Sequence, residues 1–146
     1  MDARRLTIDE VLELAAARYR RLEPAEALEA SRRGAVLVDV RSEDERADQG
    51  VAIPEALRFP LSVVFWRLDP ASPWRGVDLD LDTEVIVLCR HGYSSVLAAA
   101  LLRELGFSRA SDVVGGVEAW LEAGCPVEAD CPVEPAGTGA PSQPAV

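Results

Sequence analysis

The sequence contains no lysine and no asparagine, and its 15 basic residues are all arginine. Without lysine, the chain cannot form a Schiff base on a lysine amine or build a phosphate-binding loop that depends on lysine. The single histidine, His91, excludes a multi-histidine metal site, and no Cys-x-x-Cys pair occurs. We therefore expect neither a metal nor another cofactor.

Long apolar runs are missing as well. No segment approaches the roughly 18–20 apolar residues of a membrane span, and the charged, amphipathic N-terminus lacks the apolar core of a secretory signal. Three cysteines, an odd and small number, favour reduced thiols over a disulfide framework. These features predict a cytoplasmic protein, although they indicate no oligomeric state.

The charge balance is acidic, with a formal net charge of −10 at pH 7. A negative chain is repelled by phosphate backbones and by anionic lipid surfaces. We therefore expect partners other than nucleic acid or membranes.

Short apolar segments alternate with helical patterns along the 146 residues. Residues 35–40 and 84–88 are almost wholly apolar, as is typical of strands buried on both faces of a sheet, and 110–114 forms a third, shorter strand candidate. Helices are predicted over residues 7–19, 24–32, 42–49, 61–68, 96–105 and 117–123. This order predicts an α/β domain with a mainly parallel central sheet flanked by helices on both faces.

Cys89 follows the predicted central strand directly, and residues 90–94 separate it from a helix that starts near Ser95. Ligands of parallel α/β sheets bind beyond the carboxyl ends of the strands. A strand–loop–helix turn can direct backbone N–H groups and the positive end of a helix toward the sulfur, which favours the nucleophilic thiolate. Gly92 allows a positive φ and a close approach of the backbone to a ligand. The alternative interpretation is an ordinary buried cysteine at a strand end.

The order and spacing of six segments resemble the rhodanese-like domain family. The segments are LVDVR at 37–41, GVAIPEALRFPL at 50–61, VIVLCRHGYSS at 85–95, LRELGF at 102–107, VVGGVEAWLEAGCPVE at 113–128, and Glu45 between the first two. The resemblance implies a three-layer α/β rhodanese-like domain over residues 22–128. Residues 1–21 would then form a helical extension, and residues 129–146, rich in proline and small residues, a disordered tail.

The resemblance also implies a sulfurtransferase of the thiosulfate sulfurtransferase type. Cys89 would attack a sulfane sulfur donor, such as thiosulfate or a persulfide, and pass the sulfur from its own persulfide to a thiol or to cyanide. The following loop would bind the substrate, with Arg90, His91, Gly92, Tyr93, Ser94 and Ser95 as its residues. The partners are then a small sulfur donor and a thiol acceptor.

Two departures from the family pattern leave alternatives open. Family enzymes often carry a basic residue where this chain has Ser94, and the usual Gly-His-Ile-Pro-Gly-Ala segment is replaced by GVAIPEA. One alternative is a low-turnover module that carries or senses sulfur or docks a partner protein. Another is phosphatase or arsenate-reductase chemistry, although family members that bind phosphate or arsenate have a cysteine loop one residue longer than this one.

Asp39 and Arg41 belong to the family's DVR motif and follow the first buried strand. They could form a layer of residues behind the catalytic cysteine, or a buried ion pair that ties strand to loop. We favour the ion pair, and we expect Glu45 to join the same polar network.

The polar loop residues each have two interpretations. His91 could tune the Cys89 thiolate or be an exposed loop residue without a specific role. Tyr93 could line the mouth of the pocket or pack on a helix. Ser94 and Ser95 are typical N-caps, so we expect one of them to cap the helix, while a hydroxyl could also bond to the sulfur.

Overall fold

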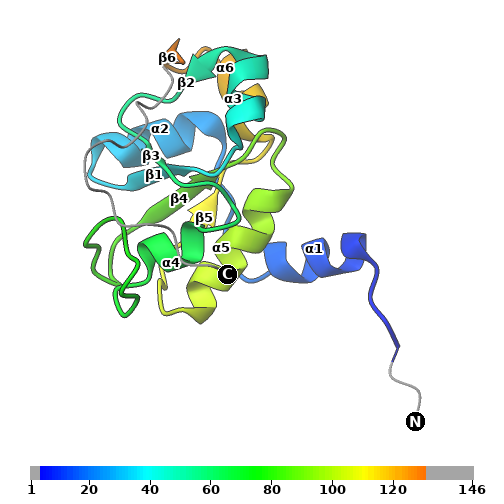
Figure 1. Cartoon of the computed structure of the whole chain (residues 1–146). Coiled ribbons are helices and arrows are strands. Elements are labelled where there is room, and N and C mark those ends of the chain that lie inside the picture. The colour runs from blue at the N-terminus through cyan, green and yellow to red at the C-terminus, as the bar shows by residue number, and fades with distance from the viewer. Residues whose placement is uncertain (1–3, 131–146) are drawn as a thin grey trace.

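The computed structural model describes residues 4–130. Its centre is a four-stranded parallel sheet in the order β3-β1-β4-β5 (Figure 1). The strands are β1 (Val36–Asp39), β3 (Leu57–Arg58), β4 (Val85–Leu88) and β5 (Ser111–Asp112). The two central strands are the apolar segments predicted from the sequence, and all four residues of β4 are buried. The predicted α/β class with a mainly parallel sheet is therefore confirmed.

One face of the sheet is covered by α2 (Pro24–Arg32) and α6 (Gly116–Glu122). Ile86 and Leu88 of β4 point to this face, where they pack against the fully buried Trp120. The other face is covered by α4 (Val64–Leu68) and α5 (Ser94–Glu104). Side chains alternate between the two faces of each strand, so an apolar strand exposes apolar side chains on both faces of the sheet. Helices bury both faces, which gives the layers of Figure 1.

Val85 and Val87 point to the second face, toward α4 and α5. Cys89 continues this alternation and belongs to the same buried cluster. The catalytic candidate thus leaves the sheet on the side covered by α5, the helix that begins directly after its loop.

The predicted helix ends hold at 24–32, whereas the helix predicted at 61–68 begins only at Val64. Residues 24–32 form α2 as expected, with Pro24 in the first turn and Gly34 at φ +108° just past the end. The strand predicted at 110–114 is limited to Ser111–Asp112, and Leu22 forms an isolated parallel bridge to Val113 beside it.

A small two-stranded antiparallel sheet lies apart from the central one. It pairs β2 (Val51–Ala52) with β6 (Glu128–Ala129), and α3 (Glu43–Gln49) precedes β2. Ala129, which pairs with Val51, belongs to the segment 129–146 for which a disordered tail was predicted. Asp130 is also described, and residues 131–146 of that segment lie outside the described residues.

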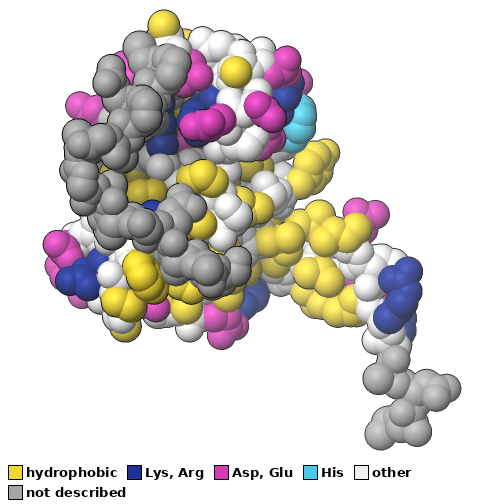
Figure 2. Space-filling model, viewed as in Figure 1, with side chains coloured by type: hydrophobic (Ala, Val, Ile, Leu, Met, Phe, Trp, Pro, Cys, Tyr) yellow, Lys and Arg dark blue, Asp and Glu magenta, His cyan; other side chains and the backbone are white. Residues whose placement is uncertain are grey.

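The N-terminal helix α1 (Ile8–Ala16) projects from the body of the domain (Figure 1). A capping box starts it, in which Glu10 N–H bonds to the Thr7 hydroxyl. Ala15 packs against α5, whereas Figure 2 shows many hydrophobic side chains gathered over α1 at the surface. The predicted helix 7–19 ends early because Tyr19 turns away to bond with Asp112 across the fold, a contact that periodicity cannot reveal.

None of the helices among residues 4–130 is long and apolar enough to cross a membrane. The same residues contain no group of three or more histidine, cysteine or acidic side chains placed to hold a metal ion. The cytoplasmic location stays a prediction.

Candidate functional site

Cys89 lies one residue past the end of β4, at the carboxyl edge of the parallel sheet. It is buried, with 4% of its surface exposed. The loop that follows returns over the sulfur and continues into α5 at Ser94. The strand–loop–helix geometry predicted from the sequence is therefore present.

Hydrogen-bonding groups converge on the Cys89 sulfur. The backbone N–H of Gly92 donates to Sγ at 3.0 Å, and the backbone N–H of Ser95 does so at 3.4 Å. The Ser95 hydroxyl lies 3.2 Å from Sγ. N–H donors placed in this way stabilise negative charge on sulfur, as they do for other anions held in backbone cradles.

The first turn of α6 binds the start of the cysteine loop. The N–H of Val117 donates to the carbonyl of Cys89 at 2.8 Å, and the N–H of Glu118 donates to the carbonyl of Arg90 at 3.1 Å. A Cβ on Gly116 would lie 2.3 Å from the Cys89 carbonyl oxygen, so only glycine permits this approach. The carbonyls of Cys89 and Arg90 thus point to α6, whereas the N–H groups of Gly92 and Ser95 point to the sulfur.

Gly92 has φ +87°, the left-handed conformation expected from the sequence. Its close neighbour is another part of the backbone, since a Cβ at Gly92 would lie 2.6 Å from the nitrogen of Gly115. The two glycine-containing turns thus pack backbone against backbone.

The charged loop side chains turn outward and pair with acids. Arg90 forms an ion pair with Asp48 of α3. His91 Nδ1 lies 2.6 Å from Glu118 of α6, with both side chains about half exposed. Tyr93 is 68% exposed. Arg90, His91 and Tyr93 form the rim of the site. Both of its basic side chains, Arg90 and His91, have acidic partners.

The predicted capping role of the loop serines is wrong. The helix begins at Ser94 and its N-cap is Tyr93. Within residues 4–130, no side chain caps it. Ser95 is instead fully buried, and its hydroxyl donates to Asp112 Oδ2 at 2.7 Å. A hydrogen bond between the Ser95 hydroxyl and the sulfur is present, as the second interpretation expected, but Cys89 Sγ is its donor and Ser95 Oγ its acceptor.

Asp39 and Arg41 form a buried ion pair with an N–O distance of 2.7 Å. Arg41 also donates to the Gln49 side chain and to the carbonyl of Val51, so the pair ties β1 to α3 and β2. Glu45 does not join them but caps α3, where its carboxylate accepts from the N–H of Ser42. These bonds favour the structural interpretation of the motif.

The sequence reasoning missed three residues beneath the loop. Asp112 of β5 is fully buried and accepts hydrogen bonds from Tyr19 at 2.7 Å and from Arg21, which binds both of its carboxylate oxygens at 2.9 Å. Hydrogen bonding to Asp112 raises the pKa of Arg21 most, and the burial of Arg21 partly opposes this effect. The pKa of Tyr19 is also raised, chiefly by burial and then by Asp112. In the sequence, the sign of this buried group was an acidic residue, Asp112, inside the short apolar segment 110–114.

The second described cysteine, Cys125, lies away from this loop in the buried cluster under α2 and α6. Burial raises the pKa of its thiol, and Arg32 partly opposes the effect. Cys125 therefore serves as an internal reference for the reactivity of Cys89.

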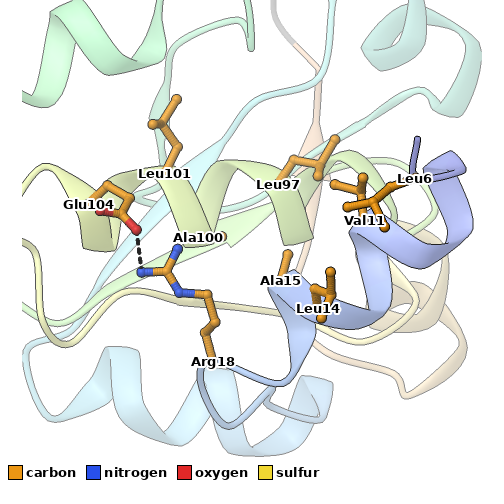
Figure 3. A pocket seen from close by; sticks show the side chains of 9 residues that line it. All are labelled: Leu6, Val11, Leu14, Ala15, Arg18, Leu97, Ala100, Leu101 and Glu104. Atoms are coloured by element: carbon orange, nitrogen blue, oxygen red, sulfur yellow. Dashed lines mark ion pairs between the residues drawn. The ribbon is translucent and has the colours of Figure 1, made fainter. Parts of the chain in front are cut away.

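An apolar groove of about 330 Å³ runs between α1 and α5 (Figure 3). The ion pair of Arg18 with Glu104, at 2.6 Å, closes one end of it. The remaining lining residues are Leu6, Val11, Leu14, Ala15, Leu97, Ala100 and Leu101. Cys89 does not line this groove, which is thus separate from the cysteine loop.

Comparison with known proteins agrees with this geometry. The family model described as rhodanese-like domain matches residues 23–123. A thiosulfate sulfurtransferase GlpE of Pseudomonas syringae pv. syringae is 38% identical over 103 residues, which span 70% of this chain and 87% of the relative. A sulfurtransferase of Allochromatium vinosum is 35% identical over 94 residues, which span 64% of this chain and 78% of the relative.

Among solved structures, a protein of unknown function from Rhodopseudomonas palustris, described as a possible tyrosine phosphatase, is similar with a TM-score of 0.74. It is 25% identical, and the match covers 88% of this chain and 98% of that protein. Taken with the sheet order and the cysteine loop, these matches show that the chain belongs to the rhodanese-like domain family.

Proposed function

We propose that this protein is a sulfurtransferase that carries a sulfane sulfur as a persulfide on Cys89. The observation that carries the proposal is the pair of backbone N–H groups, from Gly92 and Ser95, directed at Sγ. Donors in this position stabilise a thiolate before the reaction and keep the sulfur oriented during it. The sulfurtransferase names of the relatives support sulfur transfer in general.

The reaction has two steps. In the first, the Cys89 thiolate attacks the outer sulfur of the donor, a new S–S bond forms, and the donor's own bond to that sulfur breaks. The leaving group departs with the electron pair, as sulfite from thiosulfate or as a thiolate from a persulfide. In the second, a thiolate or cyanide attacks the outer sulfur of the Cys89 persulfide, and Cys89 leaves as a thiolate. No external oxidant or reductant is needed.

The rim favours a persulfide over thiosulfate as the donor. Arg90 and His91 are paired with Asp48 and Glu118, and Ser94 adds no positive charge. A dianion such as thiosulfate therefore meets no free cation among these loop residues, and the net charge of −10 repels it further. We expect a higher kcat/KM for a small thiol persulfide than for thiosulfate.

The test is mass spectrometry of the Cys89 peptide after incubation with each donor. We expect the peptide to gain the mass of one sulfur atom, and to lose it when a thiol or cyanide is added. Cys125, with its buried thiol, is the internal control and should stay unmodified. Equal sulfur uptake in a folded Cys89→Ser variant would refute the role of Cys89.

Steady-state assays separate the remaining possibilities. Formation of a persulfide with negligible turnover on all acceptors would favour a sulfur-carrying or docking module, for which the 4% exposure of Cys89 is the supporting observation. Hydrolysis of a phenyl phosphate that depends on Cys89 would favour the phosphatase chemistry suggested for the Rhodopseudomonas palustris protein.

A further inference from the structure

Arg21 occupies an unusual place between the N-terminal helix and the cysteine loop. It precedes α2 in the sequence, outside the segment that the family model matches. Its guanidinium nevertheless reaches under the loop, where its side chain is 25% exposed. One side chain from the N-terminal segment therefore contacts the centre of the candidate active site.

Two chains of hydrogen bonds lead from this guanidinium to the sulfur. In the first, Arg21 Nη2 donates to the carbonyl of Gly92 at 2.8 Å, and the N–H of Gly92 donates to Cys89 Sγ at 3.0 Å. In the second, Arg21 holds both oxygens of Asp112 at 2.9 Å, and Asp112 Oδ2 accepts the Ser95 hydroxyl at 2.7 Å. Both residues whose N–H groups face the sulfur are thus fixed by Arg21.

We propose that Arg21 is a positioning residue for Cys89, and that the N-terminal segment is consequently part of the active site. The planar guanidinium can bind a carboxylate with two parallel bonds and a carbonyl with a third, which a single ammonium group cannot reproduce. It also compensates the charge of the fully buried Asp112, which would otherwise stand uncompensated beside the site. Because it concerns the reactivity of Cys89, the proposal rests on the function proposed above.

The chain offers a matched control in the neighbouring residue. Arg20 belongs to the same segment, but its side chain is 72% exposed and pairs with Glu26 of α2 at the surface. Arg20→Met therefore removes an arginine without reaching the loop. Arg21→Met removes both chains of hydrogen bonds, whereas Arg21→Lys keeps a positive charge opposite Asp112 and loses the planar geometry.

The experiment measures the rate at which iodoacetamide alkylates Cys89 in the full-length folded protein, followed on the Cys89 peptide. We expect Arg21→Met to slow alkylation by about tenfold or more, the loss expected when a hydrogen bond to a charged group is removed. Arg20→Met should match the wild type. In sulfur-transfer assays the kcat of Arg21→Met should fall, while the KM of the donor stays within about twofold, because the rim is unchanged.

Arg21→Lys keeps the proposal testable if Arg21→Met fails to fold. It should remain folded by circular dichroism and be alkylated several-fold more slowly than the wild type. A folded Arg21 variant with wild-type alkylation rate and kcat would overturn the proposal. If the wild-type protein shows no sulfur transfer, the proposed function is refuted. The role of Arg21 would still be decided by the alkylation rates, because alkylation needs no sulfur donor.

Discussion

The close approach of two backbone turns at Gly92 allows a quantitative prediction. Gly92 has φ +87°, and an added Cβ would lie 2.6 Å from the nitrogen of Gly115. An alanine in the left-handed region costs about 1–2 kcal/mol in any protein. At Gly92 the turns must also separate by about 0.8 Å to reach an ordinary 3.4 Å contact, which adds an overpacking cost of about 1–3 kcal/mol.

Gly124 isolates the first of these two costs, the conformational one. It has φ +73°, and a Cβ there would meet no atom of the described part of the chain within 4 Å. Gly124→Ala should therefore lower the free energy of unfolding by the conformational cost alone, about 1–2 kcal/mol, whereas Gly92→Ala should lower it by roughly twice as much or more. Urea unfolding followed by circular dichroism measures both values.

The same displacement should reach the sulfur, because the N–H of Gly92 is one of its two backbone donors. A shift approaching 1 Å near a reacting atom can reduce a rate by about 100-fold. We expect Gly92→Ala to slow both sulfur uptake and iodoacetamide alkylation at Cys89, and Gly124→Ala to leave both unchanged. Equal destabilisation of the two variants, together with wild-type reactivity in Gly92→Ala, would refute the reasoning.

Three further predictions concern stability. Arg41→Met leaves Asp39 buried without its partner and should cost about 3–5 kcal/mol in urea unfolding; a cost below about 1 kcal/mol would show that the pair is dispensable. Ser111→Ala should be neutral or stabilising, since the buried hydroxyl has no hydrogen-bond partner among residues 4–130, and a clear loss of stability would contradict this. The raised pKa of Tyr19, caused first by burial and then by Asp112, means that the unfolded chain loses its phenol proton first, so stability should fall as pH rises above 10.0. Tyr19→Phe should lack that part of the fall when unfolding at neutral and alkaline pH is compared, and equal alkaline losses in both proteins would argue against it.

Local sequence signals accounted for most of the elements that build the domain. The apolar strand at 85–88 and the helix Pro24–Arg32 depend on burial and on capping residues, which are properties of neighbouring residues in the chain. The position of Cys89 after the central strand was predictable for the same reason. The Asp39–Arg41 pair was also anticipated, because opposite charges that lie together beside a buried strand are expected to form an ion pair.

The surroundings of the sulfur depended on contacts between distant segments. Asp112 is 91 residues from Arg21 in the sequence, yet its carboxylate accepts hydrogen bonds from both Arg21 and the hydroxyl of Ser95. No local pattern predicts such a pairing, since the energy of a buried carboxylate depends on which groups the fold brings to it. The same dependence explains why Ser95 binds Asp112 instead of capping its helix.

The sequence by itself therefore determined the architecture and the place of Cys89 after the central strand, because burial patterns and turn residues act over short distances. The tertiary structure alone decided which groups face that cysteine. It turned the loop arginine and histidine outward to acids and brought Arg21 beneath the loop, because ion pairs and hydrogen bonds form between whichever charged groups the packed layers place in contact.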